Sequence, residues 1–415
     1  MRLSVLLAIL PAAFAAPSVR AEPASIKRRE NGIPGKYIVR LRDEVTMASV
    51  QSARAILKTE PERTYKNVFH GFAGEMDEEE LEALSNHPDV LYIEQDGISR
   101  IAGWFDPDPE ETQTPNTLNP LIIRNTNSKY VTQTGTTWGI ARISRRAKGN
   151  KDYNYTYDDS GGEGVCNYVI DTGIDDTHKD FEGRAKQVKT WIKGEENKDF
   201  HGHGTHVAGT IGSLTFGVAK KSLLLGLKGL DRQGRGPDSG IIESIDWIPG
   251  DVKERGCANG VTVNLSLTAD TVLQSMNDAC AKLVKQGMHV AAAAGNMGRD
   301  ASQDSPASEP LVCTVAGSAE GDGRFGVSNH GKLVDINAPA MQVVSTMPGG
   351  GNDKMSGTSM ASPHVAGLAA YLMVLEKVNG GKACDRIVEL ATKDALEKLP
   401  AGTPNLLAFN GNPSG

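Results

Sequence analysis

SGTSMASPHVAGLAAYL, residues 356–372, is the stretch of sequence that decides the fold. Ser359 stands near its start, and the composition predicts a helix that continues through Leu375. The positions after Pro363 are nearly all apolar, so this helix is expected to be central and buried. Because proline is tolerated in the first turn of a helix, Pro363 is expected to help fix the start. The sequence therefore predicts a core helix that begins at a serine.

From Val131 to the C-terminus, short apolar runs alternate with helical segments. Several runs are continuous rather than alternating, which is typical of parallel strands buried on both faces. We therefore expect an α/β domain over residues 131–415, with a mainly parallel sheet flanked by helices. The expected strands are Cys166–Ile170, Leu223–Lys228, Val261–Leu267, His289–Ala293 and Leu311–Ala316.

Two further segments carry residues of a possible catalytic site. Asp171 follows the apolar run 166–170, at the strand end where open α/β sheets meet their ligands. His203 lies between two glycines in HGHGTHVAG, residues 201–209, just before a helix of small residues. With Ser359 these residues can form a nucleophilic triad, in which the histidine accepts the serine proton and the acid orients the imidazole. The order Asp, His, Ser differs from that of the α/β-hydrolases.

An acyl-transfer site also needs donors for the oxyanion. Asn296 ends the strand-like run 291–296, AAAAGN, and is expected to supply one donor. The backbone N–H of Ser359, at a helix start, can supply the second with help from the helix dipole. An esterase or lipase is disfavoured because the chain lacks a G-x-S-x-G elbow.

Three histidines close together, His201, His203 and His206, raise the alternative of a metal site. Zinc sites on helices typically use ligands at i and i+4 with an acid, as in H-E-x-x-H. This spacing lacks that pattern and a suitably placed acid, so metal binding here is disfavoured.

The N-terminal third predicts separate units. Residues 1–15 combine a basic start, an apolar run interrupted by Pro11 and an A-x-A site, as in a secretory signal peptide. The run is too short to span a membrane, so we expect a secreted, extracellular protein without a membrane anchor. Residues 36–96 alternate strand and helix signals and predict a small α+β domain. Residues 103–130 are rich in turn and linker residues and predict an exposed connector.

Charge argues against one class of function. The chain has 44 Lys and Arg against 51 Asp and Glu, for a formal net charge of −7. A nucleic-acid-binding protein needs a basic face, so no nucleic-acid partner is expected.

Long motifs now give a specific resemblance: VIDTGID, HGHGTHVAG, AAGN, SPASEP and the stretch 356–372. The chain from about Trp138 onward resembles the subtilisin-like serine proteases, and within them the fungal proteinase K group. Residues 36–96 are similar to the inhibitory propeptide of that family, a small ferredoxin-like α+β domain. The resemblance implies a monomeric serine endopeptidase that acts on proteins or peptides through an acyl-enzyme, with no catalytic cofactor. It also implies a zymogen that processes itself, with its own propeptide (residues 16–102) as inhibitor.

The resemblance assigns the catalytic roles to Asp171, His203 and Ser359, and the oxyanion hole to Asn296 with Ser359. It implies a cut within the connector 103–130, for which we predict a place near Tyr130–Val131. The rival class is a non-catalytic binding protein on a protease scaffold, and the intact triad argues against it.

The resemblance also implies covalent features of an exported protein. Its disulfide pairs are Cys166–Cys257 and Cys313–Cys384, which leave Cys280 as a small buried apolar residue. Asn154 heads a sequon in a polar stretch and is expected to be glycosylated. Asn264 heads a second sequon inside an expected strand and is expected to stay bare.

Structural calcium is a further expectation. Pro310, Val312 and Asp335 match a calcium site of the family that uses two backbone carbonyls and one carboxylate, and waters would complete the coordination. A second family site is in doubt because Arg146 stands where an oxygen ligand would be needed.

Two segments match the strands that pair with substrate in this family, and both depart from its pattern. One is Ser266-Leu267-Thr268-Ala269, where two glycines are usual; the other, residues 234–238, contains Gly234 and Gly236 and then Pro237 and Asp238. Pairing through main-chain groups can survive these changes. An aspartate replaces an aromatic residue at position 238, so the outer subsites are expected to be narrower or more polar.

The primary specificity pocket is expected to include Ala294, Gly295 and Asp304. Asp304 matches its floor, and we hypothesise that this carboxylate favours Lys or Arg before the cleaved bond. The alternative is that Asp304 points to solvent or pairs with Arg299.

Overall fold

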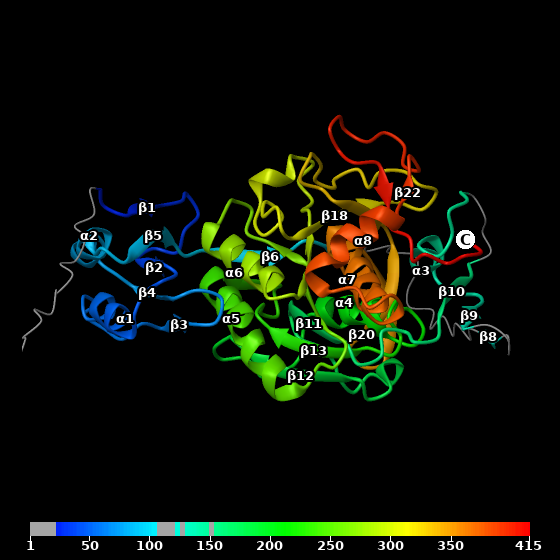
Figure 1. Cartoon of the computed structure of the whole chain (residues 1–415), viewed down its shortest axis with the longest axis horizontal. Helices are drawn as coiled ribbons and strands as arrows, with labels where there is room; N and C mark the ends of the chain where they lie inside the picture. The colour runs from blue at the N-terminus through cyan, green and yellow to red at the C-terminus, as the bar shows by residue number, and fades with distance from the viewer. Residues whose placement is uncertain (1–21, 106–120, 125–128, 149–152) are drawn as a thin grey trace, which may run out of the picture.

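The computed structural model describes residues 22–105, 121–124, 129–148 and 153–415. The predicted signal peptide and most of the predicted connector lie outside these residues. Figure 1 shows an N-terminal domain at one end of the molecule, joined by strand β6 to a larger main domain. Helix α7 (Thr358–Leu375) lies in the middle of the main domain.

The N-terminal domain is a five-stranded sheet with two helices on one face. Its strand order is β1-β5-β2-β4-β3, and β1 pairs in parallel with β5. Since β1 begins at Ser25, the folded unit is longer than the 36–96 expected. Helix α2 starts at a capping box formed by Asp77 and Glu80. The elements are β1 (Ser25–Lys27), β2 (Lys36–Leu41), α1 (Met47–Arg54), β3 (Arg63–Tyr65), β4 (Gly71–Glu75), α2 (Glu78–Asn86) and β5 (Val90–Gln95).

The main domain is built on a nine-stranded sheet, in the order β12-β13-β11-β15-β17-β18-β19-β23-β22. All adjacent strands pair in parallel except β22 and β23, as expected from the continuous apolar runs. Every predicted strand is present; the fifth begins two residues late, and β15 ends at Leu265. The strands are β11 (Cys166–Asp171), β12 (Ala185–Thr190), β13 (Leu223–Lys228), β15 (Val261–Leu265), β17 (His289–Ala293), β18 (Cys313–Ser318), β19 (Ile336–Pro339), β22 (Thr392–Lys393) and β23 (Leu406–Leu407).

Helices cover both faces of this sheet, and each face has its own apolar cluster. Val169, Ala291 and Val315 face the cluster that includes residues of α7 and α4. Tyr168 and Ile170, which alternate with Val169 along β11, face the cluster of α5 and α6. The helices are α3 (Trp138–Arg142), α4 (His203–Gly212), α5 (Asp238–Arg255), α6 (Gln274–Lys285), α7 and α8 (Ala383–Leu390).

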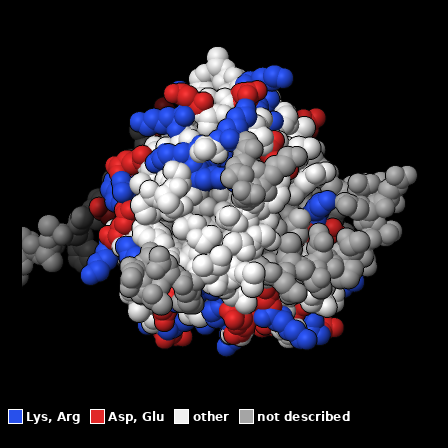
Figure 2. All heavy atoms as spheres, turned by 90° about the vertical axis from the view of Figure 1, so that its right-hand side faces the viewer, with Lys and Arg blue, Asp and Glu red and all other residues white. Residues whose placement is uncertain are grey.

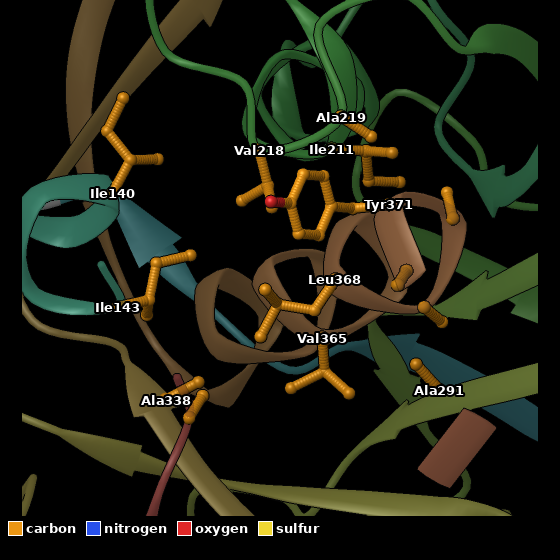
Figure 3. Close-up of a cluster of buried hydrophobic side chains, with 14 of the residues drawn as sticks. Ile140, Ile143, Ile211, Val218, Ala219, Ala291, Ala338, Val365, Leu368 and Tyr371 are labelled. Carbon is orange, nitrogen blue, oxygen red and sulfur yellow. The ribbon is translucent and has the colours of Figure 1, made fainter. Parts of the chain in front are cut away.

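Helix α7 is buried almost from end to end. Figure 3 shows Val365, Leu368 and Tyr371 of this helix among side chains from several other elements. By length and composition it is the one helix of the described residues that could cross a membrane, but its residues are packed inside the protein. Helix α7 is therefore a core helix, as predicted.

The prediction for Pro363 is wrong in detail. Helix α7 begins at Thr358, so the proline lies in the second turn rather than the first. A proline has no N–H to donate to the carbonyl four residues earlier, which here belongs to Ser359. The hydroxyl of Ser266 donates to that carbonyl instead, at 2.8 Å. The side chain of the residue that follows β15 thus makes the hydrogen bond that the proline removes from the helix.

Three small sheets complete the fold: β10-β9-β8, β14-β6-β16 and β20-β21-β7. Figure 2 shows the side of the molecule that carries α3, β9 and β10, where charged side chains of both signs gather around a broad uncharged area. The strands are β6 (Ile98–Ile101), β7 (Trp104–Phe105), β8 (Ile122–Arg124), β9 (Tyr130–Gln133), β10 (Tyr155–Asp158), β14 (Arg235–Pro237), β16 (Leu267–Thr268), β20 (Val343–Met347) and β21 (Gly351–Ser356).

Both predicted disulfides are present. Cys166 bonds Cys257, and Cys313 bonds Cys384, across 91 and 71 residues of sequence. Cys280 is free and buried in α6, as expected.

The N-terminal domain docks on the starts of two main-domain helices. Glu94 accepts hydrogen bonds from the backbone N–H groups of Gln274 and Ser275, the first residues of α6, at 3.0 and 2.8 Å. Asp96 accepts one from the N–H of Ser239 in the first turn of α5, at 3.0 Å. Each carboxylate accepts from N–H groups that have no partner inside their own helix, and each lies at the positive, N-terminal end of that helix. These contacts position strand β6, which follows directly.

Candidate active site

Asp171 and His203 form a buried pair between the main sheet and helix α4. Asp171 is the last residue of β11, and its Oδ1 lies 2.8 Å from Nδ1 of His203, the first residue of α4. The helix can approach this closely because position 204 is glycine. A Cβ there would lie 2.0 Å from the carbonyl oxygen of Gly173. The glycine after the histidine is thus what lets the motif bring His203 to Asp171.

The loop before α4 is held by Asp199, a carboxylate that was not among the predicted site residues. Asp199 accepts hydrogen bonds from the backbone N–H groups of His201, Gly202 and Thr205, at 2.8–3.0 Å. It also accepts one from the hydroxyl of Thr172, the residue after Asp171, at 2.9 Å. Asp199 stands four residues before His203, and that proximity is the only signal in the sequence that could have pointed to it.

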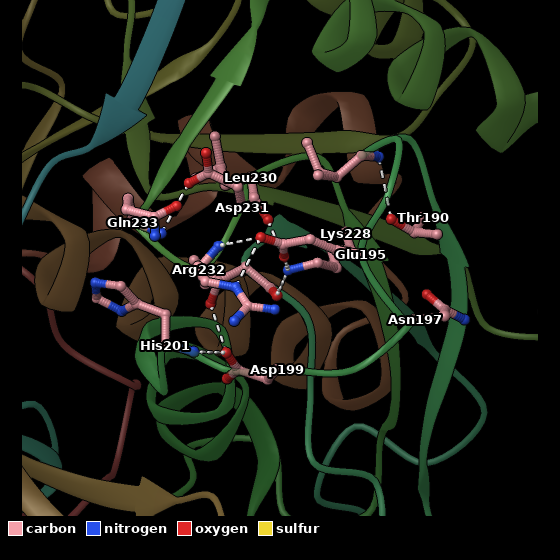
Figure 4. Close-up of polar contacts among 12 residues, drawn as sticks. Thr190, Glu195, Asn197, Asp199, His201, Lys228, Leu230, Asp231, Arg232 and Gln233 are labelled. Atoms are coloured by element: carbon pink, nitrogen blue, oxygen red, sulfur yellow. Dashed lines mark hydrogen bonds and ion pairs between the residues drawn. The ribbon is translucent and has the colours of Figure 1, made fainter.

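A second missed residue is Lys228, the last residue of β13. Its side chain is fully buried, and Nζ donates to the carbonyls of Thr172 and Leu230 at 2.9 and 3.0 Å. It also pairs with Glu195 at 3.1 Å, and Figure 4 shows this group beside Asp199. A buried lysine is stable only when paired, and Lys228 holds the backbone at Thr172, the residue after Asp171.

Ser359 and His203 both lie against Gly103, a residue of the same chain. A Cβ placed on Gly103 would lie 3.3 Å from Nε2 of His203 and 3.3 Å from Oγ of Ser359. The Ser359 hydroxyl donates to the carbonyl of Ser266 at 2.9 Å, and His203 Nε2 has no hydrogen-bond partner among the described residues. Ser359 and His203, the expected nucleophile and base, therefore lie beside the peptide bond between Ala102 and Gly103.

The carbonyl oxygen of Ala102 lies between the two expected oxyanion donors. It accepts from Asn296 Nδ2 at 2.5 Å and from the Ser359 N–H at 2.9 Å. Asn296 is oriented by a further hydrogen bond, in which its Oδ1 accepts from the N–H of Thr358 at 2.9 Å. Gly357 was also missed: a Cβ there would lie 2.5 Å from the Ala102 oxygen, so only glycine leaves room for this carbonyl.

Strand β6 approaches the site as the middle strand of a three-stranded antiparallel sheet. It pairs with β14 on one side, which contains Gly236, and with β16 (Leu267–Thr268) on the other. The N–H of Ile101 donates to the carbonyl of Gly234 at 3.0 Å, and that of Ala102 to Ser266 at 3.1 Å. The predicted substrate strands thus hold a segment of the same chain through main-chain groups, in the manner of β-augmentation.

The hypothesis of a free acid in the primary pocket is wrong. The Asp304 carboxylate is buried, and one oxygen accepts from Arg299 Nε at 3.1 Å and from Asn329 Nδ2 at 2.7 Å. Its other oxygen is bound by Nη2 of Arg299. The alternative, pairing with Arg299, is what the structure contains. Because Arg299 already pairs with this charge, the argument for Lys or Arg specificity loses its basis.

The other predicted pocket residues lie beside this pair. Ala294 accepts a hydrogen bond from Asn329 through its carbonyl, at 2.9 Å. A Cβ on Gly295 would lie 3.5 Å from an Asp304 oxygen and 2.4 Å from Asn329. Asn329 was not predicted; it links the three predicted positions, and nothing in its local sequence indicates this role.

Of the three predicted calcium positions, Asp335 offers a carboxylate with few partners. Asp335 accepts one hydrogen bond, from the N–H of Thr314 at 2.8 Å, and burial raises the pKa of its carboxyl to about 6. Val312 and Pro310 precede Thr314 in the turn that leads into β18. The sulfurs of Cys313 and Cys384 lie near this carboxylate, but their disulfide removes them as thiolate ligands.

At the second family site, the guanidinium of Arg146 donates to the carbonyls of Leu390 and Ala391, at 3.0 and 3.2 Å. A cation of the protein already occupies carbonyl oxygens at this position. This contact agrees with the doubt raised by the sequence.

Of the two neighbouring histidines, His206 makes a structural hydrogen bond. His206 Nε2 donates to the carbonyl of Val343 at 2.9 Å, and burial lowers the pKa of His206 to about 3. Burial also lowers the pKa of His201. Among the described residues, the one group with metal-ligand spacing is that around Asp335, so the histidines form no such cluster.

The two sequons differ in exposure. Asn154 is exposed just before β10. Asn264 is fully buried in β15, and its amide bonds Ser266 and Ser362. A buried asparagine with both amide atoms bonded cannot carry a glycan, in agreement with the expectation.

Comparisons with known proteins agree with this geometry. Residues 162–390 match the Subtilase family, and residues 36–102 match Peptidase inhibitor I9. The chain is 46% identical to a cuticle-degrading protease of Metarhizium anisopliae, over 99% of this chain and 100% of that protein. It is 43% identical to Proteinase R of Parengyodontium album, over 99% of each.

Among solved structures, the chain resembles a cold adapted subtilisin-like serine proteinase with a TM-score of 0.61 and 35% identity. The match covers 66% of this chain and 98% of that structure. The chain belongs to the subtilase family: it is a subtilisin-like serine protease that carries an I9 inhibitor propeptide.

Proposed function

We propose that this protein is a secreted serine endopeptidase in which Ser359 is the nucleophile, His203 the general base and Asp171 the residue that orients it. One observation carries the proposal. The Ala102 carbonyl accepts hydrogen bonds from Asn296 and from the Ser359 N–H, while Gly103 lies against His203 and Ser359. A peptide bond in this position is bound as a substrate would be.

The reaction follows from this arrangement. The Ser359 hydroxyl turns from the Ser266 carbonyl toward His203 Nε2, gives up its proton and attacks the carbonyl carbon. Asp171 keeps Nδ1 protonated, so that Nε2 is free to accept. Asn296 and the Ser359 N–H stabilise the oxyanion. His203 then protonates the leaving amine, and water hydrolyses the acyl-enzyme.

The first bond cut in maturation is Ala102–Gly103 in this proposal. The cut near Tyr130–Val131, expected from the sequence to release the mature enzyme, stays a prediction and would follow this first cut. Both residues belong to β9, which pairs with β8 on one side and β10 on the other. Since a protease binds an extended, unpaired segment, β9 would have to separate from its neighbours before that cut.

Calcium at Pro310, Val312 and Asp335 is proposed as a structural ion. A bound ion stabilises the folded state by mass action, so chelation should lower Tm by several degrees. Asp335→Asn should remove most of that calcium-dependent increment, and equal chelator sensitivity in both proteins would contradict the assignment.

The function is tested by secreting the wild type beside Ser359→Ala and following size and N-terminal sequence. We expect wild type to lose its propeptide with a new N-terminus at Gly103, or at a later trimmed site, and the variant to stay full length. A fluorophosphonate should label the wild type and not the variant. Unlabelled wild type that cleaves no protein would support the binding-protein class instead.

A further inference from the structure

The fourth residue before the Ala102–Gly103 bond contacts a buried acid that the catalytic mechanism does not use. Counting back from Ala102, that residue is Ser99, which pairs with Gly236 of β14 and is fully buried. Its hydroxyl donates to Oδ1 of Asp238 at 2.5 Å. A substrate bound in the same register would place its own fourth side chain against the same carboxylate.

All side-chain partners of Asp238 in the described structure come from the propeptide. Oδ2 is paired with the guanidinium of Arg29, and Oδ1 with Ser99. The Asp238 backbone N–H also donates to a propeptide carbonyl, that of Gly97, at 2.9 Å. When the propeptide leaves, the carboxylate loses both side-chain partners at once.

The carboxylate itself stays where it is. Asp238 is the first residue of α5, an eighteen-residue helix whose positive end favours a negative side chain there. In the zymogen the side chain is completely buried, and burial raises its pKa to about 6 even with the Arg29 cation beside it. A group that is this costly to bury favours any ligand that restores its hydrogen bonds.

We propose that Asp238 makes the subsite for the fourth residue before the cleaved bond select side chains that donate hydrogen bonds. Serine or threonine occupies the place of Ser99 directly. Lysine or arginine brings a cation toward the position that Arg29 leaves. An apolar side chain excludes water from the carboxylate and returns no hydrogen bond, and this asymmetry is what produces selection. The inference rests on the proposed cleavage geometry.

The third position offers an internal comparison. Arg100 pairs with Asp270 through Nε at 2.9 Å, but its side chain is 56% exposed. An exposed ion pair contributes little, because water and salt screen it. Replacing arginine by alanine at the third position should therefore change cleavage less than replacing the donor at the fourth.

The test uses the mature wild-type enzyme and chromogenic peptides X-Arg-Ile-Ala, with X as Ser, Arg, Ala or Leu. We expect kcat/KM to be about tenfold higher for Ser and Arg than for Ala and Leu, the order expected of one hydrogen bond to a charged group. Asp238→Asn should lose the preference for Arg and keep part of that for Ser. Asp270→Asn, the matched variant, should leave the fourth-position preference unchanged.

Equal or better cleavage of the Ala and Leu peptides by wild type would overturn this inference and leave the protease function standing. Failure to cleave any of the peptides would overturn the proposed function with it. Asp238 also holds Arg29, so its variants can fail to mature. The wild-type series needs no variant and decides the question alone.

Discussion

The two large sheets of this protein differ in what covers their faces. The main sheet has helices of its own domain on both sides. The propeptide sheet has its own helices on one side only, where Val39 and Phe72 point. Ile38 and Ala73, their neighbours along the strands, point the other way and join the cluster of α5 and α6.

This difference shows which domain depends on the other. The peptidase domain buries both faces with residues it keeps after cleavage, and both disulfides lie within it. The propeptide has no cysteine. The second face of its sheet is covered by helices α5 and α6 of the peptidase domain, from which it is later released. Release therefore exposes an apolar face on the propeptide, which favours its unfolding and removal.

The largest expected effect is a loss of stability of the peptidase domain. Replacing both Cys313 and Cys384 by serine removes a link across 71 residues, which should cost about 4 kcal/mol of unfolding free energy on the loop-entropy model. Denaturant unfolding of the inactive Ser359→Ala chain measures it. A propeptide transition that falls as much as the peptidase transition would contradict the division between the domains.

The next effect acts at the hydrogen bond between Asn296 and the Ala102 carbonyl, where the propeptide meets the proposed catalytic site. Asn296→Leu removes a donor to the Ala102 carbonyl and should lower kcat by about 10²–10³ with little change in KM. Maturation should slow in parallel, because the same donor serves the propeptide bond. Pulse-chase of secreted protein and peptide kinetics measure the two; normal maturation with slow peptide cleavage would contradict a common site.

A smaller effect concerns the face of the propeptide sheet that packs against α5 and α6. Phe69 is buried against Tyr65, with ring centroids 5.2 Å apart, in the cluster that contains α5 and α6. In the Ser359→Ala chain, Phe69→Ala should lower the stability of the propeptide by about 3 kcal/mol. Calorimetry should show an earlier propeptide transition and an unchanged peptidase transition. Leu84→Ala, on the other face, is the matched comparison and should not weaken docking directly.

The smallest effect is a pH dependence of release. The pKa of Asp238 is raised by burial to about 6 in the docked state, against an ordinary value near 3.8. A raised pKa means that the docked state binds the proton better than the released state does. The docking that this group supports is therefore fully present below about pH 4 and is lost as pH rises through about 6. Release of the cleaved propeptide should be faster at pH 7 than at pH 5, and Asp238→Asn should flatten the profile.

The sequence predicted the features that depend on residues close together along the chain. Strand β11 and its terminal Asp171 followed from an apolar run, and the small residues after His203 predicted helix α4. The disulfides came from resemblance. What the sequence could not predict depends on distant partners: Asn329 with Asp304, Lys228 with Thr172, and Ser266 with Ser359.

Pro363 illustrates why. The rule that places proline in a first turn assumes that nothing else can satisfy the freed carbonyl. Here Ser266, 93 residues away from Ser359 along the chain, satisfies it. The prediction for Asp304 failed for a related reason. The local sequence does not show whether the carboxylate is already paired with a cation of the protein, here Arg299.

Ser266 therefore has a consequence for alignment. Its hydroxyl holds the backbone of Ser359, and its carbonyl accepts both the Ser359 hydroxyl and the N–H of Ala102. Ser359 and Ala102 are thus both held in position by Ser266. A substitution at Ser266 would therefore disturb the position of Ser359 and that of Ala102 together.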